Sequence, residues 1–202
     1  LDEQDYLADD WSYQARAGYI GRINYNYKER YILEVLGRYD GSYLYYTDSQ
    51  FGFFPGISAA WRISDESFFA PLKSAVSDLK FRASYGVTGS EIWNTANFNE
   101  QFPMFSYLGG FNFGDGNSVL DGNFVNGLRP RGLPVRNLSW VENKTTNVGI
   151  DISLLNYKLT ASFDLFERRR TGLPAARYDV KLPSEVGYSL PRENLESDAH
   201  RG

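Results

Sequence analysis

Hydrophobic and polar residues alternate along several stretches of the chain. In residues 79–88 the odd positions are largely apolar, as at Phe81, Ala83 and Tyr85. The even positions include the charged residues Lys80 and Arg82. A period of two residues predicts a β-strand with one apolar face and one polar face. The same pattern predicts strands near 13–27, 31–40, 56–64, 79–88, 145–154 and 158–170, with no more helix than a short turn in 65–78.

The connections between these strands mostly alternate between short and long. Residues 28–30 and 155–157 leave room only for tight turns, whereas long loops are expected near 41–55, 89–139 and 171–193. Bacterial outer-membrane barrels show the same arrangement, with short periplasmic turns and longer outer loops. The pattern therefore favours a barrel wall whose long loops all lie at one end.

Aromatic residues gather near both ends of the predicted strands. Those near the short turns are Tyr25, Tyr27, Tyr31, Trp61 and Phe81. Those near the long loops are Trp11, Tyr13, Tyr39, Tyr43 and Trp140. Two such bands are typical of the interfacial girdles of a membrane barrel. The alternative is that aromatic residues are simply common in strands.

Composition narrows the function classes. The 202 residues include no cysteine and a single histidine, which leaves no disulfide framework or thiolate metal site and argues against a zinc or triad enzyme. We therefore expect no enzyme, no metal site and no cofactor. A net charge of −4 gives no indication of nucleic-acid binding. Aromatic residues make up 16% of the chain, which favours an all-β fold.

The number of strands indicates what kind of β-protein this is. Barrels close with eight or more strands, and about six predicted strands would leave open edges that lipid does not tolerate. We therefore interpret the chain as an antiparallel transmembrane β-barrel segment that belongs to a larger barrel. The alternative from another class is a soluble β-sandwich that acts as a carbohydrate-binding module.

Five stretches in this order resemble a known family. They are NYNYKERYILEVLGRYDGS (24–42), FPGISAAWRIS (54–64), LKFRASYGVTGS (79–90), LSWVENKTTNVGIDISLLNYKLTASFDLFERRRTGL (138–173) and ENLESDAHRG (193–202). Together they resemble the middle-to-late part of the barrel of SusC/RagA-type TonB-dependent outer-membrane transporters of the Bacteroidetes. The loop 89–139 matches none of the family's motifs.

The resemblance implies a function and a set of partners. The family has a barrel of about 22 strands that is plugged by an N-terminal domain. It imports glycans or peptides with energy from TonB and with a SusD-like surface lipoprotein as a lid. For this chain it implies an outer-membrane location, contact with lipid and the rest of the barrel, and 1–202 as a partial barrel without a plug domain.

Two groups of residues are candidates for function. The polar residues expected to face the barrel lumen are Arg16, Arg22, Arg38, Lys80, Arg82 and Asp151. The loop aromatics that could contact a ligand or partner are Trp93, Phe105, Tyr107 and Phe111. The aromatic residues could equally form a small core of the loop itself.

Overall fold

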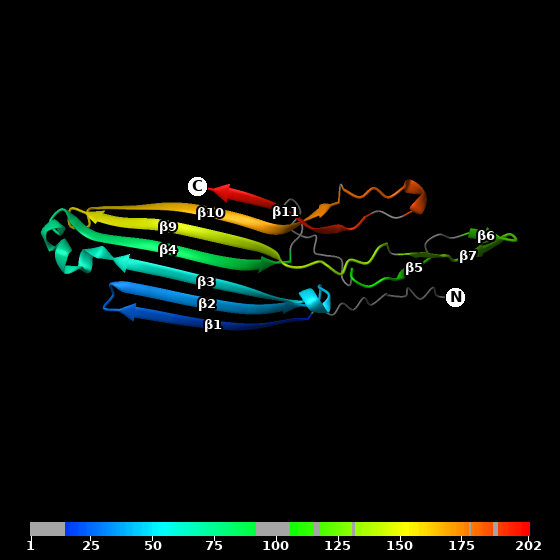
Figure 1. Cartoon of the computed structure of the whole chain (residues 1–202), viewed down its shortest axis with the longest axis horizontal. Coiled ribbons are helices and arrows are strands. Elements are labelled where there is room, and N and C mark those ends of the chain that lie inside the picture. Colours follow the sequence, from blue (N-terminus) through cyan, green and yellow to red (C-terminus); the bar gives the residue numbers. More distant parts are fainter. Residues whose placement is uncertain (1–14, 92–105, 115–117, 131, 178, 188–189) are drawn as a thin grey trace, which may run out of the picture.

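A computed structural model describes residues 15–91, 106–114, 118–130, 132–177, 179–187 and 190–202. Its main element is a seven-stranded antiparallel sheet in the order β1-β2-β3-β4-β9-β10-β11 (Figure 1). The strands are β1 (Arg16–Tyr27), β2 (Tyr31–Ser42), β3 (Phe51–Arg62), β4 (Val76–Ser90), β9 (Val141–Leu154), β10 (Leu159–Ala176) and β11 (Arg192–Arg201). Neighbouring strands in the sheet follow one another in the described chain apart from the excursion between β4 and β9, and the sheet does not close.

The connections separate the sheet into two ends. At the short-turn end lie the turns 28–30 and 155–158 and the connection that carries the 3-10 helices η2 (Ile63–Asp65) and η3 (Ser67–Leu72). At the long-loop end lie η1 (Thr47–Ser49), η4 (Ser184–Val186) and a projecting arm (Figure 1). The arm holds two small antiparallel pairs, β5 (Phe111–Phe113) with β8 (Leu128–Pro130) and β6 (Ser118–Leu120) with β7 (Asn123–Val125).

The strand register sorts the side chains onto two faces. One cross-strand row on the apolar face runs Tyr27, Tyr31, Trp61, Phe81, Ile150 and Phe163. The adjacent row on the polar face includes Asn26, Arg82 and Asp164. Side chains of successive residues point to opposite sides of a strand, so the alternation in the sequence becomes a difference between two faces.

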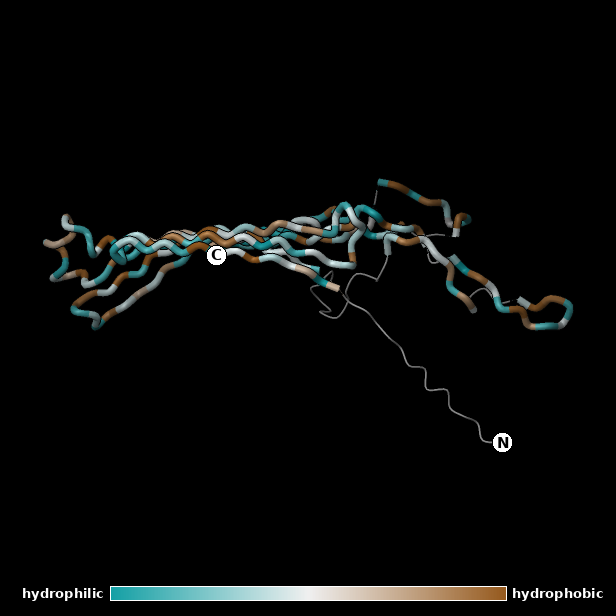
Figure 2. The backbone as a smooth tube through the Cα atoms, turned by 90° about the horizontal axis from the view of Figure 1, so that it is seen from below, coloured by the Kyte–Doolittle hydropathy of each residue, from teal (hydrophilic) through white to brown (hydrophobic). Residues whose placement is uncertain are grey.

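Neither face of the sheet is covered by a second layer within the described residues (Figure 2). Large apolar side chains on the apolar face are mostly exposed, with Tyr19 at 74% and Leu165 at 73%. The compact hydrophobic cluster lies instead at the long-loop end, where Leu44 and Leu138 are almost fully buried together with Tyr45 and Val135. A β-sandwich would bury one face of each sheet, so the described residues do not form the sandwich considered as the alternative.

Both tight turns place side chains in the left-handed backbone region. Lys28 and Glu29 have φ of 52° and 57°, and Leu155 to Tyr157 have φ between 52° and 64°. This conformation is uncommon for residues other than glycine. Hydrogen bonds compensate in part, since Asn26 Oδ1 accepts from the Glu29 N–H at 2.9 Å and Ser77 Oγ accepts from the Asn156 N–H at 2.9 Å.

Several strands extend beyond their predicted ranges; β4 spans Val76–Ser90 and β9 begins at Val141. β3 begins at Phe51, inside the expected loop 41–55, because Tyr39 of β2 pairs with Phe53 despite the nearby Gly52 and Pro55. β10 continues to residue 176 through a bulge at Gly172. The expected loop 89–139 contains the four short strands β5 to β8.

The strand β11 is absent from the sequence prediction, which treats this part of the chain as a loop up to residue 193 and a tail without strands. Its sequence RENLESDAHR lacks an apolar alternation. Ion pairs to β10 contribute to its pairing instead, between Arg170 and Asp198 and between Glu167 and Arg201. Charged side chains are common on edge strands, and such strands give no hydrophobic signal.

The aromatic band predicted at the long-loop end also differs from the structure. Trp140 and Tyr43 pack against the buried cluster around Leu44 and Leu138. Trp140 lies 5.3 Å from the ring of Tyr45 and donates from Nε1 to the carbonyl of Gln50 at 3.3 Å. These rings close the base of the long loop, while Tyr39 stays exposed; Trp11 and Tyr13 lie outside the described residues.

Candidate functional site

A charged cluster lies in the middle of the polar face and centres on Arg82 of β4. Its guanidinium forms ion pairs with Asp151 of β9 at 2.8 Å and with Asp164 of β10 at 3.1 Å. The hydroxyl of Ser162 donates to the other oxygen of Asp151 at 2.8 Å. Gly149 lies opposite Arg82 in the register, and a Cβ there would meet Asp164 Oδ1 at 2.5 Å. The cluster therefore joins three neighbouring strands over a glycine.

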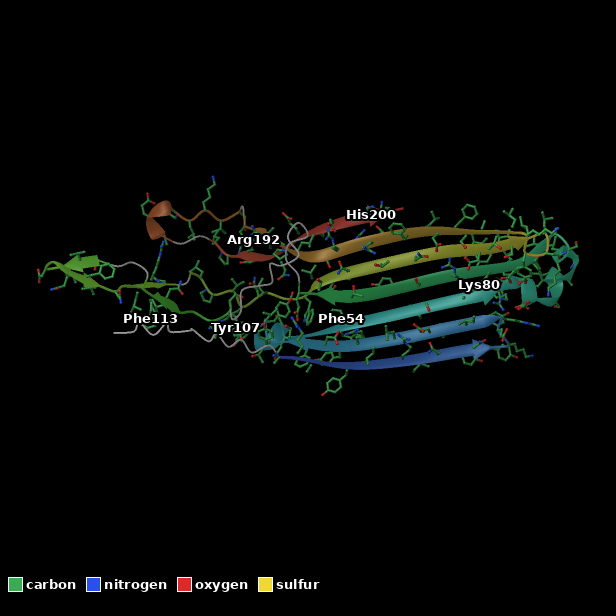
Figure 3. All side chains as sticks on the ribbon, turned by 180° about the vertical axis from the view of Figure 1, so that it is seen from behind. Phe54, Lys80, Tyr107, Phe113, Arg192 and His200 are labelled. Carbon is green, nitrogen blue, oxygen red and sulfur yellow. The ribbon has the colours of Figure 1, made fainter. Side chains whose placement is uncertain are left out.

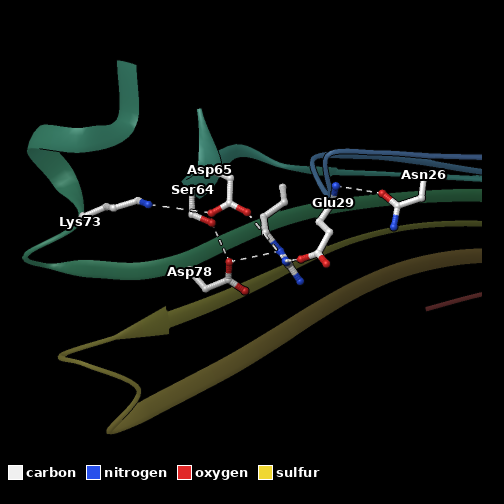
Figure 4. A network of polar contacts seen from close by, with 7 residues as sticks. Asn26, Glu29, Ser64, Asp65, Lys73 and Asp78 are labelled. Carbon is white, nitrogen blue, oxygen red and sulfur yellow. Dashed lines mark hydrogen bonds and ion pairs between the residues drawn. The ribbon is translucent and has the colours of Figure 1, made fainter. Parts of the chain in front are cut away.

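A second network surrounds Arg62 at the short-turn end, and Figure 4 labels its partners Glu29, Asp65 and Asp78. Arg62 approaches the carboxylates of Asp78, Asp65 and Glu29 at 3.7 to 3.8 Å. The hydroxyl of Ser64 donates to Asp78 at 2.6 Å. These contacts fix the exit of β3 against the entry of β4 and the β1–β2 turn.

Glu66 forms a separate link beside this network. Its Oε1 accepts a hydrogen bond from the Tyr31 hydroxyl at 2.7 Å and another from Trp61 Nε1 at 3.2 Å. These two donors, together with Arg30, lower the pKa of the Glu66 carboxyl below its ordinary value. The ionised carboxylate thereby connects the row of aromatic side chains to the η2–η3 connection.

The long-loop end carries two further ion pairs on the polar face. Arg16 of β1 pairs with Glu91 after β4 at 2.7 Å, and Arg38 pairs with Asp40 on the same strand at 3.0 Å. Close by, burial raises the pKa of the Tyr45 hydroxyl. This phenol therefore stays neutral in the hydrophobic cluster at physiological pH.

Asn194 of β11 fastens the base of the long loop. Its Oδ1 accepts from the Ser139 N–H at 3.0 Å, and its Nδ2 donates to the carbonyls of Ser139 and Gly172 at 3.0 and 2.6 Å. Gly172 has φ of 78° and occupies the bulge of β10. Neither Asn194 nor Asp164, a partner of Arg82, is among the residues singled out from the sequence. The parity of β10 indicates the face of Asp164, but nothing in the sequence indicates the partners of Asn194.

The register places the six predicted polar residues on one face of the sheet. The members of this set are Arg16, Arg22, Arg38, Lys80, Arg82 and Asp151. Arg82 and Asp151 contact each other, and Lys80 lies opposite Asp151 in the register. Arg16 and Arg38 lie at the long-loop end, and Arg22 lies between the two groups along β1.

The predicted loop aromatics do not form one site among the described residues. Tyr107 packs edge-on against Tyr46, with ring centroids 5.8 Å apart, at the base of the loop. Phe111 lies on β5 in the arm and is 59% exposed. Phe113 on the same strand, labelled in Figure 3, is 88% exposed. Trp93 and Phe105 lie outside the described residues.

The described residues contain no group of three acidic or histidine side chains arranged to hold a metal ion. None of the helices in the described part of the chain has the length and hydrophobicity to cross a membrane. The polar face of the described sheet therefore offers charged and hydrogen-bonding side chains.

Comparison with known proteins relates the chain to a set of receptors. It is 34% identical over 193 residues to the TonB-dependent receptor P39 of Formosa agariphila, which covers 96% of the chain and 17% of the relative. It is 29% identical over 189 residues to the TonB-dependent receptor SusC of Bacteroides thetaiotaomicron, with 91% and 17% covered. The chain thus spans under a fifth of the length of these relatives, and no family model matches it.

Solved structures with the same fold are those of the RagAB peptide importer. In its closed-closed state the match has a TM-score of 0.70 at 22% identity and covers 93% of this chain and 19% of the importer chain. The named relatives are receptors and importers rather than enzymes.

Proposed function

Since this chain belongs to the SusC/RagA type of TonB-dependent transporters, we propose that it forms a section of the barrel wall through which such a transporter imports its solute. The observation that carries the proposal is the sheet itself. It is a single layer with one exposed apolar face and one charged face, and its loops differ in length between the two ends. Such a sheet needs a different environment on each side.

The apolar face is assigned to lipid and the polar face to the lumen. An Arg or Lys on the lipid face costs about 2–4 kcal/mol at the middle of the bilayer. The Arg82 cluster in the middle of the sheet would therefore be unfavourable in lipid. Among the strand residues of the apolar face, charges such as Lys144 and Arg169 occur only toward the long-loop end, beyond Val148 and Leu165. This distribution supports a lipid-facing band that lies on the short-turn side of those charges.

The orientation follows from the loops. The long-loop end faces outward and the short-turn end faces the periplasm, as in bacterial barrels. The Arg62 network then lies at the periplasmic rim of the lumen, and Arg16 and Arg38 lie at its outer mouth. The same assignment places the projecting arm outside the cell.

The imported solute is proposed to be a glycan or a peptide, because one named relative is a SusC receptor and the structural neighbours are a peptide importer. The proposed partners are TonB, which acts through parts of the transporter beyond this segment, and a SusD-like surface lipoprotein. The arm supports an outer partner, since it exposes the apolar residues Phe113, Val119 and Phe124. Exposed apolar patches of this kind are common at interaction sites.

Site-directed labelling of the full-length protein in cells tests the wall. Cysteines replacing Tyr19 or Ile23 should react with a lipid-soluble maleimide and resist a water-soluble one. Cysteines replacing the adjacent polar-face residues Arg22 or Asn24 should show the reverse preference. Equal labelling of both sets by the water-soluble reagent, or recovery of the protein in the soluble fraction, would contradict the proposal. Deletion of the gene tests import directly through the loss of growth on the transported glycan or peptide.

A further inference from the structure

An open groove of about 590 Å³ lies at the long-loop end of the polar face. We call it the rim groove and define it by Arg16, Gly18, Arg38, Asp40, Glu91 and Trp140, which are among its lining residues. It is separate from the Arg82 cluster, whose members do not line it. The rim groove thus lies where the sheet meets the long loops.

Two guanidinium groups in the rim groove are each anchored along one edge. Arg38 donates from Nε to Asp40 Oδ2 at 3.0 Å, and its Nη2 lies 3.0 Å from the same oxygen. Arg16 donates from Nε and Nη2 to Glu91 Oε2 at 3.0 and 2.7 Å. The Nη1 groups make no hydrogen bond within the described part of the chain. Each guanidinium is therefore oriented from one side, and among the described residues it has no hydrogen-bond partner on the other.

In the rim groove the positive charges lie nearer to solvent than the negative ones, an arrangement that we call layering. The side chains of Arg16 and Arg38 are 47% and 51% exposed, whereas those of Glu91 and Asp40 are 11% and 22% exposed. A solute therefore meets the guanidinium groups first, although the groove as a whole is balanced in charge. A planar guanidinium group can bind a carboxylate through two parallel hydrogen bonds. A guanidinium that is already held in place loses less conformational entropy when it binds.

Gly18 allows this layering on the side of β1. Asp40 faces Gly18 across the β1–β2 pair, and a Cβ at Gly18 would lie 2.5 Å from Asp40 Oδ1. The carboxylate of Asp40 can thus lie close over the β1 backbone and hold Arg38 above it. Any larger residue at this position would force the Asp40 carboxylate, and with it the guanidinium, to move.

We propose that the rim groove binds a carboxylate of the transported solute through Arg16 and Arg38. The inference rests on the proposed function, in which the polar face lines the lumen and this end faces outward. Two sources supply the same chemistry, the C-terminal carboxylate of a short peptide and the uronate carboxylate of an acidic oligosaccharide.

Isothermal titration of the purified full-length protein in detergent tests the proposal. The probes are trialanine, trialanine amide, trigalacturonate and neutral maltotriose. One of the two carboxylate probes should bind at least about tenfold more tightly than its uncharged counterpart, because a hydrogen bond between a guanidinium and a carboxylate is stronger than one between neutral groups. The probe that binds identifies the source of the carboxylate.

Substitutions assign the binding to the groove. Arg38→Gln and Arg16→Gln should each weaken the carboxylate probe about tenfold, while leaving the melting temperature of the protein near that of the wild type. Arg177→Gln is the matched control, because Arg177 also pairs with a neighbouring carboxylate, Asp179, but lies in the loop after β10. This variant should bind as the wild type does.

The outcomes separate the inference from the proposed function. Equal affinity for the acid and its uncharged counterpart, no binding of either carboxylate probe, or unchanged binding in both arginine variants would overturn the inference. If the cysteine labelling above still assigns the two faces as expected, the transporter wall stands without the carboxylate site. If Arg22→Cys and Asn24→Cys react only with the lipid-soluble reagent, both fail.

Discussion

Arg16 of β1 and Glu91, just beyond β4, form an ion pair with Nη2 and Oε2 2.7 Å apart. The two residues are 75 positions apart in the chain, and β2 and β3 lie between their strands in the sheet. The pair therefore reaches across the polar face at its long-loop end. It ties the first described strand to the start of the long loop.

A double-mutant cycle on Arg16→Gln and Glu91→Gln measures this link. The Arg16 side chain is 47% exposed, so solvent weakens the attraction and we expect a coupling energy of about 0.2–1 kcal/mol. Semi-native gels separate the folded from the heat-unfolded full-length barrel by their mobility. Titration with urea on such gels gives the free energy of unfolding of each variant. A coupling of several kcal/mol would mean that the pair is far better shielded than the structure indicates.

Removing Arg82 should destabilise the wall more than removing the neighbouring Lys80. Arg82→Met leaves Asp151 and Asp164 without their shared cation, so two neighbouring carboxylates of like charge then destabilise the sheet and lower the urea midpoint. Lys80→Met is the control on the same strand and face, since Lys80 makes no ion pair within 4.0 Å in the described part of the chain. Urea midpoints of the two variants give the comparison, and equal midpoints would show that the cluster contributes nothing specific.

Two glycines of β4 should respond differently to alanine. A Cβ at Gly89 would lie 2.1 Å from the Phe54 ring, which is buried, whereas nothing lies within 4 Å of a Cβ at Gly86. Gly89→Ala should therefore cost about 1–3 kcal/mol through overpacking. Gly86→Ala should be neutral or slightly stabilising, since alanine reduces the freedom of the unfolded chain. The same gel assay compares them, and a reversed order would contradict the packing of Phe54.

Asn194→Ala should loosen the long loop at its base. The substitution removes the three hydrogen bonds to Ser139 and Gly172, which leaves their backbone groups without this partner and costs about 1–3 kcal/mol. Limited proteolysis of intact cells should then cut the loop faster than in the wild type. Asn24→Ala is the control, because the side chain of Asn24 makes no hydrogen bond to the described residues. Identical cleavage of the two variants would argue against the clamp.

Glu66 should make the short-turn end sensitive to acid. Its pKa is lower in the folded protein than the ordinary 4.5, chiefly through the hydrogen bond from Tyr31. Its contribution to stability is therefore complete above pH 4.5 and is lost as the pH falls through the lower folded value. The stability difference between wild type and Glu66→Gln should shrink between pH 6 and pH 3, as followed by thermal melting. A constant difference would show that the ionised form has no such role.

The sequence by itself determined the class of fold and the two faces of each long strand. A period of two residues puts Phe81 and Arg82 on opposite sides whatever the surroundings are, and the prediction of an antiparallel barrel segment is confirmed by the similarity to the RagAB fold. The motifs also carried enough information to recognise the family. These properties are local, so the order of the residues is sufficient to define them.

Only the tertiary structure decided which distant residues meet. The pairing of Arg16 with Glu91, the position of Asp164 beside Arg82 and the three bonds of Asn194 depend on strand register and on a bulge. The strand β11 and the burial of Trp140 likewise depend on partners far along the chain. Long-range ion pairs and loop packing leave no periodic signal, because their partners are brought together only when the sheet forms.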